Sequence, residues 1–107
     1  MDRQRLIEQR ILARHRLIAE RLQADPERVL GHTRANLERW ARSYSEDRLP
    51  GWLREWRTLL ERPLPEILAI LVSDSENTRR LRSSSPFAGI VSPRERWAIH
   101  REIRDDP

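Results

Sequence analysis

Prolines that follow helix-capping residues divide this sequence into short segments with hydrophobic residues at helical spacing. Asp25-Pro26 and Ser92-Pro93 each place a favourable N-cap residue before a proline, which fits the first turn of a helix. Pro50 and Pro65 begin two more segments, and Arg62-Pro63 ends the one between them because a residue before proline avoids helical geometry. The sequence predicts an all-α fold, a compact bundle of four to five short helices with a basic amphipathic helix at its N-terminus.

The expected helices cover residues 3–23, a segment from 26, 50–62, 65–72, 74–82 and 93–104. Ser73 and Glu76 have capping-box spacing and predict the start of the fifth helix, and Ser92 with Glu95 predicts the start of the last. The stretch 67–72 is the most uniformly apolar and should lie at the centre of the core. Three of the four tryptophans fall on apolar helix faces and should be buried: Trp40, Trp52 and Trp56.

Residues 1–24 are interpreted as an arm distinct from a helical domain of residues 25–107. An apolar stripe on this helix lies beside arginines, and the residues concerned are Ile7, Ile11, Ile18 and Leu22 with Arg10, Arg14 and Arg21. Apolar and arginine rows side by side favour a helix that projects and lies in a groove on another protein. The alternative is a helix on its own domain, with arginine stems that cover apolar surface.

The charge of the chain is unevenly distributed. All 21 basic residues are arginine, the net charge is +4, and both ends are basic while the centre is mildly acidic. An arginine guanidinium binds carboxylate or phosphate through two parallel hydrogen bonds. This pattern suits a partner with an acidic groove, and the small net charge is weak support for nucleic acid as the primary ligand.

The residues needed for catalysis or metal binding are missing from the sequence. There is no cysteine, and His15, His32 and His100 lie on three different expected helices without an i, i+4 histidine pair. Three glycines are too few for a phosphate-cradling loop, and no serine lies in a nucleophile elbow. We expect no enzymatic activity, cofactor or metal. Without an apolar run of membrane-spanning length or a signal-peptide core, we expect a cytoplasmic protein with no membrane partner.

A basic cluster beside a serine-rich loop is the best candidate for contact with nucleic acid. Arg79, Arg80 and Arg82 precede the run 83–85, and serine hydroxyls and amides contact phosphate in many complexes. The helices expected at 65–72 and 74–82 could form a helix-turn-helix. The turn lacks glycine, however, and acidic residues begin the second helix, where they would face DNA unfavourably.

Several short strings of the sequence resemble a group of small bacterial proteins. They are Asn36-Leu37-x-Arg39-Trp40, Trp52-Leu53-x-x-Trp56, Ser73-Asp74-Ser75-Glu76, Arg79-Arg80-Leu81-Arg82, Ser84-Ser85-Pro86-Phe87-Ala88-Gly89 and Ser92-Pro93-x-Glu95-Arg96-Trp97. The group accompanies toxin genes and resembles antitoxins of type II toxin–antitoxin pairs, some with nucleotidyltransferase-like toxins. The resemblance covers about residues 26–100. It implies a protein that neutralises a cognate toxin by direct binding and represses its own operon, and it contributes no catalytic residue.

The function expected from these features is occlusion of a toxin by an antitoxin-like protein. The expected partner-binding residues are Arg10, Arg14, Arg21, Arg79, Arg80, Arg82, Phe87 and Trp97. For Phe87 there is a structural alternative, in which the ring fills the core and Gly89 forms a positive-φ turn. Two other functions stay open: a regulator that binds operator DNA, and a helical scaffold that forms a homodimer.

Overall fold

The computed structural model describes residues 2–104, and these residues form six α-helices and one short 3₁₀ helix. The expected all-α bundle of short helices is confirmed. The elements in chain order are α1 (Arg3–Ala24), α2 (Pro26–Ala41), η1 (Glu46–Arg48), α3 (Gly51–Leu59), α4 (Leu64–Val72), α5 (Glu76–Arg82) and α6 (Pro93–Glu102).

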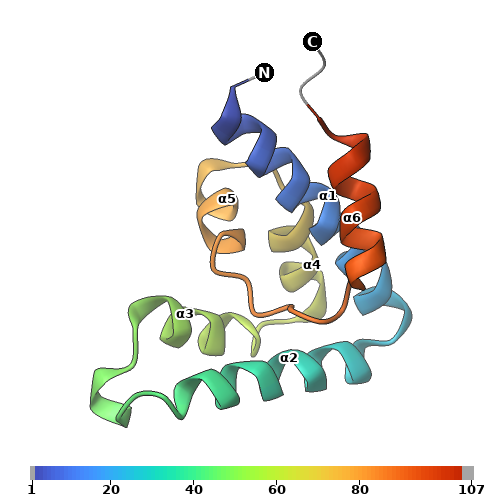
Figure 1. The fold of residues 1–107 in the computed structure, drawn as a ribbon. Helices are drawn as coiled ribbons and strands as arrows, with labels where there is room; N and C mark the ends of the chain where they lie inside the picture. The colour runs from blue at the N-terminus through green and yellow to red at the C-terminus, as the bar shows by residue number, and fades with distance from the viewer. Residues whose placement is uncertain (1, 105–107) are drawn as a thin grey trace.

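The N-terminal helix lies within the bundle. Figure 1 shows α1 beside α4, α5 and α6, with α2 and α3 across one end of this group. Helix α1 packs most extensively against α4 and also contacts α2, α5 and α6. Ile18 and Leu22 from its apolar stripe are buried in the core of the chain itself. The expectation of a projecting arm is therefore wrong, because that stripe is covered by the other helices of the domain.

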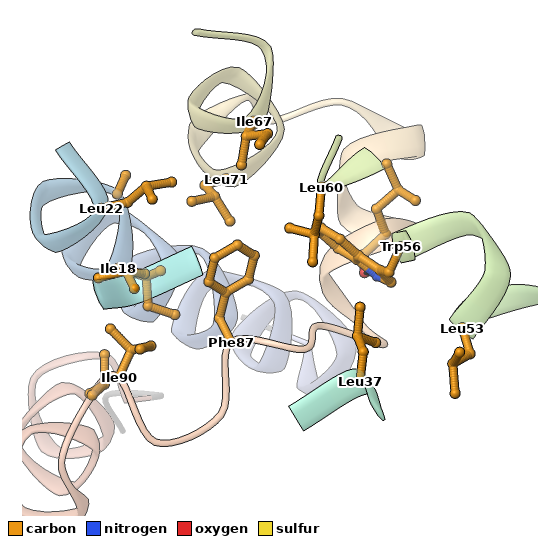
Figure 2. Close-up of a cluster of buried hydrophobic side chains, with 14 of the residues drawn as sticks. Ile18, Leu22, Leu37, Leu53, Trp56, Leu60, Ile67, Leu71, Phe87 and Ile90 are labelled. Atoms are coloured by element: carbon orange, nitrogen blue, oxygen red, sulfur yellow. Dashed lines mark hydrogen bonds between the residues drawn. The ribbon is translucent and has the colours of Figure 1, made fainter. Parts of the chain in front are cut away.

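The core gathers side chains from helices α1 to α5 and from the loop 83–91 around Phe87. Figure 2 shows its ring in the middle of the cluster, between Leu71 and Leu60. The rings of Phe87 and Trp56 meet edge to face, with 5.9 Å between their centroids. Trp56 is fully buried as expected, whereas Trp40 and Trp52 pack against the rim of the core and stay half-buried. In α4 the buried residues are Ile67 and Leu71, while Val72 is exposed.

Side-chain caps fix the helix starts. Ser92 and Glu95 form the expected capping box at α6, and Asp25 accepts a hydrogen bond from the Arg28 backbone N–H at α2. The box that begins α5 is formed by Ser75 and Thr78. The expectation of Ser73 as that cap is wrong, because Ser73 is the C-cap of α4.

A histidine lies in the core. His15 is almost fully buried on α1, and its Nδ1 donates a hydrogen bond to the Ile11 carbonyl at 2.7 Å. Its Nε2 atom is buried without a hydrogen-bond partner among the described residues. The pKa of His15 is lowered to about 4, mainly by burial and to a smaller extent by the positive charges of Arg14 and Arg82, against the raising effect of the Ile11 bond. His15 is therefore neutral in the folded protein at neutral pH.

This burial predicts a loss of stability in mild acid. The unfolded chain takes up a proton at His15 below its ordinary pKa of 6.5, while the folded chain does not until pH about 4. The free energy of unfolding should therefore fall by about 2 kcal/mol between pH 7.5 and pH 5. Urea unfolding at each pH measures this, and His15→Leu should flatten the profile while His100→Gln, at an exposed position, should not. Parallel profiles for wild type and His15→Leu would contradict the assignment.

Candidate functional site

Two arginines of α1 hold α6 against it at both ends. Near the C-terminus of α6, Arg10 donates hydrogen bonds from Nε to the Ile103 carbonyl at 2.7 Å and from Nη2 to the His100 carbonyl at 3.2 Å. Near the N-terminus, Arg21 donates to the Ile90 carbonyl at 2.7 Å and pairs with Glu95. The two helices therefore run side by side in opposite directions, as Figure 1 shows.

The Arg21–Glu95 pair is joined to the cap of α6. Both oxygens of the Glu95 carboxylate accept hydrogen bonds from the Arg21 guanidinium, and the Ser92 backbone N–H donates to the same carboxylate at 2.9 Å. The Arg21 bonds, followed by that of Ser92, lower the pKa of Glu95 to about 2. Arg10 and Arg21 thus have a structural role, because they donate hydrogen bonds to α6, to its C-cap residue and to the loop before it.

A groove of about 450 Å³ lies on the surface shared by α1 and α6, between the contacts of Arg10 and those of Arg21. These two sets of contacts are called the clamps below. Its apolar lining residues are Ile7, Ile11, Pro93, Trp97 and Ile99, and its other lining residues are Arg10, Arg14, Arg96 and His100. No carboxylate is among the described residues that line it. The groove is therefore an apolar surface with positive charge only.

Arg14, which lies between Arg10 and Arg21 on α1, has no carboxylate partner among residues 2–104. Within residues 2–104, neither Arg14 nor Arg96 forms an ion pair. Partial burial lowers the pKa of Arg14, and the nearby positive charge of Arg96 lowers it further. Two like charges thus share the groove without compensation, which costs stability in the free protein.

Trp97, one of the partner-binding residues expected from the sequence, is exposed. Its side chain is 59% exposed, the largest exposed fraction among the large hydrophobic residues described as exposed. The indole stacks on the His100 ring, with 5.4 Å between centroids and 7° between planes. Ile7, also exposed, lies in the same groove. An exposed apolar surface beside unpaired arginines is typical of a binding site.

The arginines of α5 are neutralised or buried. Arg82 is 2% exposed and donates from Nη1 to the Ile70 and Ser73 carbonyls at 2.9 and 2.6 Å. Arg80 forms two 3.0 Å bonds to the Glu55 carboxylate, and Arg79 contacts Asp74. Arg82 is thus inaccessible to a partner and the expectation of a binding role for it is wrong, since it caps α4. The local sequence had not distinguished it from its neighbours.

A second hollow, of about 760 Å³, lies between α1 and α5 and carries both signs of charge. It includes Arg79 and Arg80, together with four carboxylates: Asp2, Glu8, Asp74 and Glu76. The positive charge of the basic cluster expected on α5 is therefore balanced by the carboxylates around it. This hollow is larger than the α1–α6 groove but lacks its uncompensated charge.

The loop 83–91 has a structural role. Phe87 is 2% exposed, so its expected role as a surface anchor is wrong and the core alternative is confirmed. Asn36 Nδ2 donates to the Pro86 and Ala88 carbonyls at 3.0 and 2.9 Å, and His32 Nε2 bonds to the Ala88 carbonyl. Gly89 has φ of 86°, and a Cβ there would lie 2.8 Å from the His32 ring. The sequence did not predict that Asn36 binds this loop. The feature that could have indicated it is an amide side chain on the apolar face of α2.

Comparison with models of protein families, with curated protein sequences and with solved structures finds no significant match. Among the described residues, no helix is both long enough and apolar enough to span a membrane. In the same range, no group of three or more histidine, aspartate or glutamate side chains is placed to hold a metal ion.

The different roles of the α1 arginines give a stability prediction. Arg21→Gln removes the bonds to Glu95 and Ile90 and should lower the free energy of unfolding by about 1 kcal/mol. Arg14→Gln removes the repulsion with Arg96 and keeps a polar side chain, so it should leave stability unchanged or raise it. Urea unfolding of the two variants at pH 7.5 compares them directly. Equal destabilisation by both would mean that Arg14 is a third clamp.

Proposed function

We propose that this protein is an antitoxin-like inhibitor that binds a cognate intracellular toxin and blocks it by occlusion. The observation that carries the proposal is the α1–α6 groove, where Arg14 and Arg96 have no carboxylate partner among the described residues and lie beside exposed Trp97. Arginine and tryptophan are the residues that most often dominate binding energy in protein interfaces. The protein contributes binding and no chemical step.

The groove is already formed in the free chain. Arg10 and Arg21 hold α6 on α1 from both ends, so the groove walls are fixed before a partner arrives. A preformed surface loses little conformational entropy on binding, which favours affinity. Of the binding residues expected from the sequence, this proposal keeps Arg14 and Trp97. It adds Arg96, which lines the same groove.

The α5 arginines give little support to the DNA-binding alternative. Arg82 is buried, and Arg80 and Arg79 pair with Glu55 and Asp74. Binding to a DNA backbone depends on several basic side chains free to neutralise phosphates. A recognition role for α5 would require these ion pairs to break.

Co-expression with the product of the neighbouring gene in a bacterial host tests the proposal, with growth and co-purification as readouts. The wild-type chain should restore growth and co-purify with the neighbour. The triple variant Arg14→Gln, Arg96→Gln, Trp97→Ala should lose both and keep its helical circular dichroism, because these side chains line the groove and none is fully buried. Arg94→Gln, an exposed position of α6 outside the groove, is the matched control and should behave as wild type.

A neighbour that is harmless alone, or toxic but not rescued, contradicts the antitoxin function. Duplex DNA binding that weakens steeply with salt would then support the regulator. A mass that rises with concentration to that of a homodimer, without rescue, would support the scaffold.

A further inference from the structure

We infer that the α1–α6 groove binds a short acidic segment of a partner protein, with one apolar side chain of that segment against the apolar lining of the groove. This inference rests on the proposed function, because it gives the chemistry of the segment that the same groove recognises. The argument comes from the charge, the apolar lining and the size of the groove.

The positive charge of the groove favours a ligand with a carboxylate. Arg14 is partly buried, its pKa is lowered by that burial and by Arg96, and neither guanidinium has an acidic partner among the described residues. A carboxylate placed between them would bind through charge-assisted hydrogen bonds and remove their mutual repulsion. Because the lining residues include no acid, such a segment would meet no opposing negative charge.

The lining also calls for an apolar anchor. Ile7, Ile11, Ile99 and Trp97 present hydrocarbon and aromatic surface to solvent along the same groove as the two arginines. Covering this surface yields about 25 cal/mol for each Å² removed from water. A purely ionic ligand would leave it exposed, so a ligand with both a carboxylate and an aliphatic or aromatic side chain fits best.

The dimensions fit a few side chains. A volume of about 450 Å³ lies within the usual range of sites that take a small ligand or the anchor residues of a peptide. Within the part of the chain that the structure describes, two guanidiniums of the groove, those of Arg14 and Arg96, have no acceptor, whereas Arg10 is bound to the carbonyls at the end of α6. A nucleic acid strand would need a longer row of free cations for its phosphates, whereas an acidic peptide needs one or two.

Selection from a phage-displayed library of random peptides of about twelve residues, with the full chain as bait, tests this inference. The enriched sequences should be rich in aspartate and glutamate around a leucine, isoleucine or phenylalanine. A selected peptide, labelled with a fluorophore, then gives a Kd by anisotropy. The double variant Arg14→Gln, Arg96→Gln should raise that Kd at least about tenfold, as should Trp97→Ala. Arg94→Gln should leave it unchanged.

Enrichment of peptides without acidic residues, the absence of enrichment, or equal binding by the double variant would overturn the inference. Binding of a labelled random single-stranded DNA that the double variant loses would assign the groove to nucleic acid and also overturn it. The two proposals fail separately. Acidic peptides that bind the groove without rescue of growth would remove the antitoxin function alone, and rescue that survives the double variant would remove the acidic-segment proposal alone.

Discussion

Arginine side chains close the C-terminal ends of three helices in this domain. Arg34 donates to the Leu60 carbonyl at the end of α3, Arg82 donates to two carbonyls at the end of α4, and Arg10 does the same at the end of α6. The last carbonyls of a helix have no intrahelical donor, and the negative end of the helix dipole attracts a cation. In a chain that is only 37% hydrophobic, these bonds join elements that a small core holds weakly.

The same bonds determine which arginines remain for a partner. Along α1, Arg10 and Arg21 lie opposite the two ends of α6, so both are used to hold it. Arg14 lies between them, where α6 presents Arg96 in place of an acceptor. The spacing of the clamps along α1 therefore leaves one half-buried cation in the middle of the groove, beside Trp97.

Local sequence signals predicted the helices well and the roles of individual arginines poorly. Proline and capping patterns placed the six helices within a few residues, because such signals act within one turn. Arg79, Arg80 and Arg82 look equivalent in the sequence, yet only Arg82 is buried. That difference depends on where the end of α4 lies in space, as does the burial of Phe87 against Trp56. The exposure of Trp97 was easier to predict, because the sequence of the helix that carries it, α6, contains few apolar residues.

The uncompensated positive charge of the groove is unfavourable in the free protein, which supports the proposal of a partner. A half-buried Arg14 beside Arg96 is unfavourable in the free protein, and a neutral side chain at either position would remove the repulsion. Structural arginines elsewhere in the fold obtain carbonyl or carboxylate acceptors from the chain itself. The acidic partner that we propose would supply the missing acceptor, and its binding would then stabilise this domain by mass action. Sites that bind are commonly the places where a fold gives up stability in this way.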